Sequence, residues 1–211
     1  MPYQIVVDMD GVITPQPLEP GEGFHNAGQS SLLGSTIGDF WQWAYSDLVG
    51  NTDRGTLAEF IVAKAIDDAS PTRNAWEPFD LTTAAGIKVE VKSAAFAQSW
   101  HQKQPTRVQF SIKKTMEWEP RTNSFQPPAS RHSDVYVFCL LAEMVKENLN
   151  PLDLEQWEFY VLSTKQIERD FGDRQSVSLK QVKDRSSCHP VDKLSAAVSQ
   201  VLNRSRGERR F

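Results

Sequence analysis

The segment from Gly86 to Ser93 contains the residues best suited to chemistry. Its sequence, Gly-Ile-Lys-Val-Glu-Val-Lys-Ser, alternates apolar and polar residues and predicts a β-strand. Because successive strand side chains point to opposite faces, Glu90 and Lys92 share one face while Val89 and Val91 share the other. A carboxylate and an amine side by side above an apolar face indicate a metal-assisted hydrolytic site.

A second carboxylate lies shortly before this strand. Residues 80–83 and 87–92 flank a short Ala-Ala-Gly connection, which predicts a β-hairpin. A turn centred near Ala85 places Asp80 roughly opposite Glu90, and directly opposed residues share a face. Two carboxylates this close repel each other unless a cation lies between them. Oxygen ligands of this kind suit Mg²⁺ or Mn²⁺.

A third carboxylate lies on an expected helix. Residues 52–66 carry an apolar stripe at helical spacing, and Asn51, Thr52 or Asp53 is expected to cap the start of the helix. Glu59 sits inside this mostly apolar run, where a carboxylate is costly unless it finds a cation or a hydrogen-bond partner. Thr56-x-x-Glu59 leaves a second interpretation open, which is a capping box at a later helix start.

An acid on a helix, an Asp on a hairpin and an E-x-K on the next strand, in this order, resemble the PD-(D/E)XK nuclease superfamily. The motif-bearing part runs from about residue 51 to residue 100, and the matching positions are Glu59, Asp80, Glu90 and Lys92. One departure is that Phe79 separates Pro78 from the Asp, whereas the namesake motif has Pro and Asp adjacent. The resemblance implies a restriction-endonuclease-like core. The pattern of elements along the chain likewise predicts an α/β fold, with a mixed central β-sheet flanked by helices.

The resemblance also implies a Mg²⁺-dependent endonuclease that hydrolyses DNA phosphodiester bonds, with Mn²⁺ as a substitute ion. Asp80 and Glu90 would hold the metal, the backbone carbonyl of Val91 would add a ligand, and Glu59 would join them or hold a metal-bound water. Lys92 would orient or deprotonate the attacking water, or stabilise charge that develops on the phosphate. The implied role is restriction or defence against foreign DNA, with DNA repair as the alternative. Double-stranded DNA is the expected partner, and a homodimer is expected because one site cuts one strand.

Two other functions stay open from the sequence. The segment 5–12 resembles the first motif of haloacid-dehalogenase-type phosphatases, in which Asp8 would be the nucleophile and Asp10 the acid/base. The later motifs of that family fit poorly, since Asp67-Asp68 ends an expected helix instead of a strand. The other alternative is a DNA-binding subunit that kept the nuclease fold and lost catalysis, although all four expected side chains are present.

The chain divides into three expected parts. Residues 1–35, rich in Pro, Gly and Ser from position 14, are expected to form an extended N-terminal arm, residues 36–203 a single nuclease-like α/β domain, and residues 204–211 a basic tail. Within the domain, residues 36–49 predict a helix that ends at Gly50 and packs its aromatic residues on the core or on a partner. Residues 93–103 predict a helix or a loop, residues 118–133 a loop, residues 134–142 and 157–162 buried strands, residues 163–172 a capped helix, and residues 191–201 a final amphipathic helix.

Length and composition narrow the class of protein. With 211 residues the chain can form one domain with a full core, and its net charge of −4 argues against nonspecific nucleic-acid binding by the whole surface. Two local groups of basic residues, which read either as a DNA-contacting lane or as solvated surface, are Lys103, Arg107, Lys113, Lys114 and Arg121, and Arg204, Arg206, Arg209 and Arg210.

Cysteine usage and hydropathy point to the compartment. The two cysteines, Cys139 and Cys188, offer no disulfide framework, and Cys188-His189 is too sparse for a zinc site. The sequence contains neither an apolar run long enough to span a membrane nor a signal peptide. A cytoplasmic protein without membrane contact is therefore expected.

Overall fold

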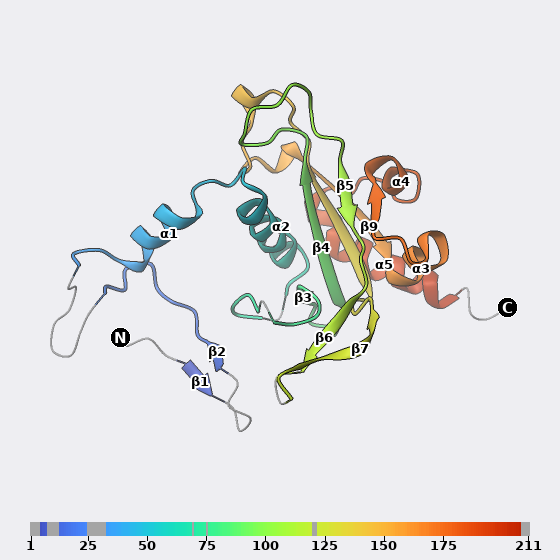
Figure 1. Ribbon diagram of the computed structural model, residues 1–211, viewed down its shortest axis with the longest axis horizontal. Helices are drawn as coiled ribbons and strands as arrows, with labels where there is room; N and C mark the ends of the chain where they lie inside the picture. The colour runs from blue at the N-terminus through green and yellow to red at the C-terminus, as the bar shows by residue number, and fades with distance from the viewer. Residues whose placement is uncertain are drawn as a thin grey trace.

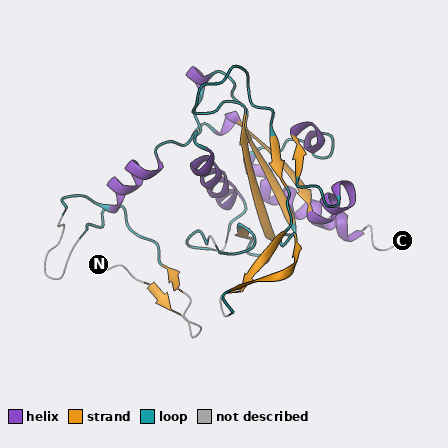
Figure 2. Cartoon of the chain, in the orientation of Figure 1, coloured by secondary structure: helices purple, strands orange, loops and turns teal. Residues whose placement is uncertain are grey.

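The central feature of the chain is a mixed four-stranded sheet. A computed structural model describes residues 5–7, 13–24, 33–68, 70–74, 76–119 and 122–207. The sheet has the strand order β3-β4-β8-β9 and lies between helices, as Figures 1 and 2 show. Its strands are β3 (Leu81–Thr82), β4 (Lys88–Ala95), β8 (Val135–Leu141) and β9 (Trp157–Ser163). Strands β4 and β8 run parallel and the other two pairs run antiparallel, so the expected α/β class with a mixed sheet is confirmed.

Two layers cover the sheet, one on each face. Helices α2 (Asn51–Ala65) and α5 (Leu194–Gly207) pack on one face. The second face is covered by β5 (Gln109–Ser111), α3 (Thr164–Phe171), β10 (Ser176–Ser178) and α4 (Leu179–Lys183). The remaining elements are β1 (Ile5–Val7), β2 (Ile13–Pro15), α1 (Ile37–Tyr45), β6 (Thr115–Glu119), β7 (Ser124–Ser130) and the short 3₁₀ helices η1 (Lys146–Asn148), η2 (Leu154–Gln156) and η3 (Val191–Lys193).

Strand β8 contributes side chains to both layers. All seven of its residues are buried. Because side chains alternate along a strand, Val137 packs with the α2 and α5 layer while its neighbour Phe138 packs with the β5 and α3 layer. A continuous apolar run is what a strand covered on both faces requires. The buried strands expected at residues 134–142 and 157–162 are thus confirmed.

Strand β4 carries both buried and only partly buried side chains. It pairs with β8 from Val89 to Ala95, whereas its register with β3 covers only Lys88 and Val89. Val89 and Val91 are buried toward α2, while Glu90 and Lys92 are half-buried on the other face. From Glu90 onward, within the described residues, the β3 side of β4 is therefore an edge that no strand covers.

The hairpin that joins β3 to β4 has the expected turn. The Gly86 N–H donates to the Thr83 carbonyl at 2.8 Å, and the Thr83 N–H donates to the Ile87 carbonyl at 3.0 Å. Gly86 has a φ of +76°, a left-handed conformation that glycine adopts without a steric penalty. The predicted β-hairpin is confirmed.

Helix α2 begins earlier than the capping-box interpretation required. Its N-cap is Gly50, which makes no side-chain cap, so a cap by a residue at 51–53 is wrong. The Thr56 hydroxyl donates to the Thr52 carbonyl at 3.3 Å inside the helix. Glu59 therefore lies in the third turn of α2 and is not part of a capping box.

Two expectations for the flanking segments are also wrong. Helix α1 ends at Tyr45 instead of Val49 and buries none of its side chains, and Trp43 is 84% exposed. Figure 1 shows α1 standing away from the sheet, so its aromatic residues do not pack on the core. Thr115–Glu119 and Ser124–Ser130 pair as the β6–β7 hairpin, although a loop is expected over residues 118–133. Pro127 and Pro128 fit there because both are exposed on a two-stranded ribbon, where a missing N–H faces solvent.

The other expected segments lie close to their predicted positions. Residues 96–103 form a loop after β4. Helix α3 is capped by Ser163, whose side chain accepts from the Gln166 N–H, and Gly172 follows its last residue. Helix α5 continues to Gly207, so the first residues assigned to the basic tail are helical. No helix in the described ranges has both the length and the apolar character needed to cross a membrane.

Candidate functional site

Asp80 is fixed beside the open edge of β4 by two hydrogen bonds. Its N–H donates to the Val89 carbonyl at 3.1 Å, and its carboxylate accepts from the Val91 N–H at 2.7 Å. Glu90 lies between these two contacts in the sequence of β4. The hairpin therefore brings Asp80 alongside Glu90, as the turn at Gly86 predicts.

Glu90 and Lys92 form an ion pair on the face of β4 that points away from α2. The Lys92 Nζ contacts Glu90 Oε1, and both side chains are about one quarter exposed or less. The two residues are two positions apart on one strand, so the alternation of side chains brings them together. The contact places an ammonium group next to the Asp80–Glu90 pair.

The electrostatics of the site are dominated by Asp80. Burial, and after it the charge of nearby Glu90, raises the pKa of the Asp80 carboxyl from its ordinary value to about 7. The hydrogen bond from Val91 and the charge of Lys92 act in the opposite direction, but they do not offset the first two causes. A cation bound between Asp80 and Glu90 would compensate this excess of negative charge.

Glu59 lies across from this pair and already has a partner. Both oxygens of Glu59 accept from Arg73, with Oε1 at 3.0 Å from Nη2 and Oε2 in contact with Nε. This two-pronged geometry is the strongest form of an Arg–carboxylate pair. The charge of Glu59 nevertheless contributes to raising the pKa of Asp80, so the two carboxylates are electrostatic neighbours.

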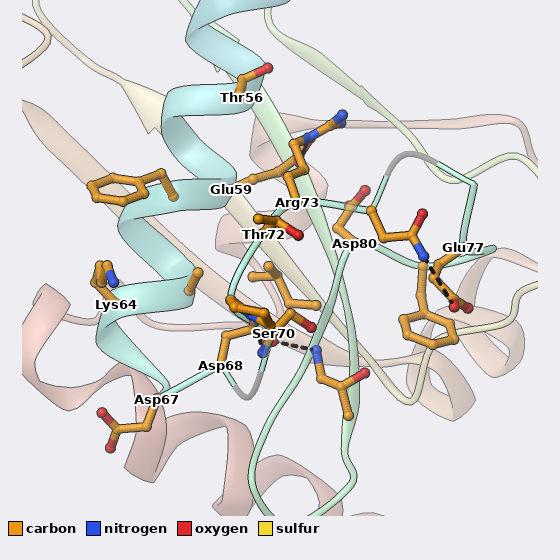
Figure 3. Close-up of a pocket in the computed structure, with 17 residues that line it drawn as sticks. Thr56, Glu59, Lys64, Asp67, Asp68, Ser70, Thr72, Arg73, Glu77 and Asp80 are labelled. Atoms are coloured by element: carbon orange, nitrogen blue, oxygen red, sulfur yellow. Dashed lines mark hydrogen bonds and ion pairs between the residues drawn. The ribbon is translucent and has the colours of Figure 1, made fainter. Parts of the chain in front are cut away.

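A cavity of about 460 Å³ separates α2 from the segment that leads into β3. Figure 3 shows Glu59 and Arg73 together on the α2 side of this cavity and Asp80 farther along its wall. Asp68, which also lines the cavity, is hydrogen-bonded to the β3–β4 hairpin, because its carboxylate accepts from the Thr82 N–H at 2.8 Å. The cavity gives solvent and small ions access to the Asp80 side of the site.

The donor atoms at this edge fit a divalent cation with two carboxylate ligands. A strand residue points its N–H and C=O to the same edge, so the Val91 carbonyl faces the side where its N–H meets Asp80. Asp80, Glu90 and this carbonyl form a hard oxygen set, and Mg²⁺ commonly takes one or two carboxylates and completes its shell with water and phosphate. Among the described residues, no group of three His, Cys, Asp or Glu side chains is close enough to hold a metal ion. Glu59 lies near the candidate metal ligands but is engaged by Arg73.

The structure places three of the four predicted residues together and adds one that sequence reasoning missed. Asp80, Glu90 and Lys92 lie together at the edge of β4. Glu59 lies on the other side of the candidate site, in an ion pair with Arg73. Arg73 lies in an irregular segment, and nothing in its local sequence marks it as the partner of a residue on α2.

Other candidate groups have partners elsewhere or lie outside the described residues. Lys114 pairs with Asp173 at 2.7 Å. The phosphatase residues Asp8 and Asp10 lie outside the described residues, as do the basic residues Arg121, Arg209 and Arg210.

Comparison of the chain with models of known protein families gave no match, and comparison with curated proteins gave none either.

Proposed function

We propose that this chain is a metal-dependent endonuclease that hydrolyses DNA phosphodiester bonds in restriction or in defence against foreign DNA. The observation that carries the proposal is the meeting of Asp80, Glu90 and Lys92 at the uncovered edge of β4. Two carboxylates with a raised pKa at one of them, next to an amine, are suited to metal-assisted hydrolysis.

The order of the elements supports the same proposal. The acid-bearing helix α2 precedes the β3–β4 hairpin, and the hairpin carries the Asp and then the E-x-K. This is the order by which the sequence resembles the PD-(D/E)XK superfamily. We therefore extend the proposal to a restriction-endonuclease-like core built on the mixed sheet.

Each residue has a distinct part in the proposed chemistry. Asp80, Glu90 and the Val91 carbonyl would hold Mg²⁺, which supplies a water of lowered pKa and neutralises charge on the phosphate. Lys92 is kept beside the carboxylates by its ion pair with Glu90, so its ammonium can orient the attacking water or donate to a phosphate oxygen. The half-buried carboxyl of Asp80 is held by the Val91 N–H, which limits its freedom to turn away.

Arg73 and Glu59 form the opposite side of the proposed site. The ion pair neutralises Glu59, so a full third negative charge does not add to the repulsion between Asp80 and Glu90. The Arg73 side chain is nearly half exposed at the cavity, while Glu59 is 14% exposed. This arrangement leaves Glu59 available to hold a metal-bound water if Arg73 turns to the substrate phosphate.

A DNA cleavage assay tests the proposed activity. Supercoiled plasmid and labelled linear duplex are incubated with the protein in Mg²⁺, Mn²⁺ or EDTA. We expect cleavage only with divalent ions, and a loss of at least about 100-fold in Lys92→Ala. Lys88→Ala, which removes an exposed lysine from the same face of the same strand, is the matched control and should retain activity.

The same assay separates the alternatives. A protein that binds DNA but never cuts it with any divalent ion is the inactive binding subunit. Release of inorganic phosphate from small esters that is lost in Asp8→Asn, with no DNA cleavage, indicates the phosphatase. The role in defence is tested by plating bacteriophage on cells that express the protein, where protection should disappear with Lys92→Ala.

A further inference from the structure

A wall of aromatic rings stands directly beside the two carboxylates. A second cavity, of about 290 Å³, is lined by Asp80 and Glu90 together with Trp76, Trp118 and Phe125. The rings come from two places, since the first precedes β3 and the other two lie on the β6–β7 hairpin. The fold therefore gathers these rings at the one place where the candidate metal ligands lie.

The rings form one continuous cluster that leaves much of its surface in solvent. The Trp118 and Phe125 centroids are 4.9 Å apart in an edge-to-face arrangement, and the Trp76 and Trp118 centroids are 6.3 Å apart. Trp118 is partly covered by its neighbours, but Trp76 is 74% exposed and Phe125 is 59% exposed. Trp118 contacts a ring on each side, and the two outer rings, Trp76 and Phe125, keep most of their surface in solvent.

The chemistry of the neighbouring groups indicates what the rings would contact. Carboxylates that hold a divalent ion bring a phosphodiester to the site, and the groups next to a phosphodiester are nucleosides. Aromatic side chains bind nucleobases by stacking, and the interaction tolerates any base because every base has a π-face. A volume of about 290 Å³ lies at the lower end of ligand pockets, so it suits a single base and not a duplex.

We infer that Trp76, Trp118 and Phe125 stack an unpaired nucleobase next to the phosphodiester that is cut. This inference rests on the proposed endonuclease function and specifies its substrate. In a duplex both faces of a base are covered by its stacked neighbours, so a ring can reach a base only where the nucleotide is unpaired, terminal or turned out of the helix. The preferred substrate is then duplex DNA that carries a single-stranded flap, overhang or unpaired nucleotide at the cut.

The decisive comparison uses two labelled DNAs of one sequence, one fully paired and one with a single-stranded flap at the cut. With Mg²⁺ we expect the wild-type kcat/KM to favour the flap substrate by roughly 5- to 150-fold, the range that stacking one base supplies. Trp76→Ala should lower cleavage of the flap substrate toward that of the paired one. Trp76→Phe, which keeps a ring, should restore part of the preference.

Trp43→Ala is the matched control. Trp43 is an exposed tryptophan on α1 that does not line the cavity, so the variant should keep the wild-type preference. A flap that lacks the one base next to the cut adds a second readout. Removal of this base should slow cleavage by the wild type. It should have no further effect on cleavage by Trp76→Ala, because both changes delete the same contact.

A binding measurement keeps the inference independent of turnover. With Ca²⁺ in place of Mg²⁺, we expect a flap that carries 2-aminopurine beside the cut to lose fluorescence on wild-type protein and to lose much less on Trp76→Ala. Equal cleavage of both DNAs by the wild type, or an equal loss on both in Trp76→Ala, overturns the stacking while the endonuclease stands. Cleavage of neither DNA with Mg²⁺ or Mn²⁺ overturns the proposed function and the inference together.

Discussion

The carboxylate of Asp80 accepts a hydrogen bond from the backbone N–H of Val91 at 2.7 Å. Asp80 lies just before the first residue of β3, where β4 extends past the end of β3. The side chain thus takes the ladder position that a longer β3 would have filled. A carboxylate in this position is half-buried, lies next to Glu90 and shares its edge of the sheet with the Val91 carbonyl. The short length of β3 leaves this edge of β4 open for the proposed cation.

Asp80→Asn should weaken divalent-ion binding. The amide keeps an oxygen that can accept from the Val91 N–H, but it removes the charge that attracts the ion. We expect Mn²⁺ binding, measured by calorimetry or electron paramagnetic resonance, to weaken by at least about 10-fold. Asp68→Asn is the control because Asp68 lines the same cavity and is held by the hairpin backbone instead. Equal Mn²⁺ affinity in wild type and Asp80→Asn contradicts the assignment.

The free energy of unfolding of the metal-free protein should fall as the pH rises from about 4 to about 7. The pKa of the Asp80 carboxyl is about 7 in the fold and 3.8 as the ordinary value, so between these limits the folded state binds more protons than the unfolded state. The loss amounts to at most about 4 kcal/mol and levels off above pH 7. Urea unfolding at several pH values measures it.

The same titration has two internal checks. Asp80→Asn should remove this part of the pH dependence, because the amide does not titrate. Mg²⁺ in excess should raise the stability of the wild type most above pH 7, where Asp80 is ionised. A wild type and an Asp80→Asn variant with identical pH profiles would show that Asp80 is not the group that titrates.

Removal of Arg73 should strengthen metal binding. The Arg73 guanidinium neutralises Glu59, so Arg73→Ala leaves an uncompensated carboxylate near Asp80. The added negative potential is expected to tighten Mn²⁺ binding several-fold. Arg107→Ala removes an exposed arginine that does not line the cavity and should leave the affinity unchanged. Weaker binding in Arg73→Ala would mean that Arg73 holds Glu59 in place as a ligand.

Truncation of a buried side chain on the central strand β8 should lower the free energy of unfolding more than a substitution at the surface does. Phe138 on β8 is fully buried and its ring lies edge-on to Phe110 at 5.1 Å between centroids. Phe138→Ala is expected to lower the free energy of unfolding by roughly 3–5 kcal/mol. Trp43→Ala on α1 should change it by no more than about 0.5 kcal/mol. Chemical denaturation of both variants compares the two values.

The parts of the fold with strong local signals were predictable from the sequence. The continuous apolar run at β8 indicated a strand buried on both faces, and the Ser163 cap with Gly172 defined α3 almost to the residue. The glycine at 86 set the turn and hence the register that brings Asp80 to Glu90. These features depend on neighbours within a few residues.

The remaining features depend on contacts that local sequence does not encode. The ion pair of Arg73 with Glu59 joins an irregular segment to the middle of a helix. The β6–β7 hairpin forms in spite of Pro127 and Pro128 because a two-stranded ribbon has free edges. Helix α1 ends early and stays exposed, although its aromatic residues suggest packing on the core or on a partner. In each case contacts between distant parts of the chain determine the structure, and local sequence propensity does not.

The most direct test is the position of a bound ion. A crystal of the protein soaked in Mn²⁺ should give an anomalous peak between the carboxylates of Asp80 and Glu90, within reach of the Val91 carbonyl, and the peak should be absent from Asp80→Asn crystals. A fully soaked crystal with no peak at this edge of β4, or with its only peak elsewhere, would contradict the account.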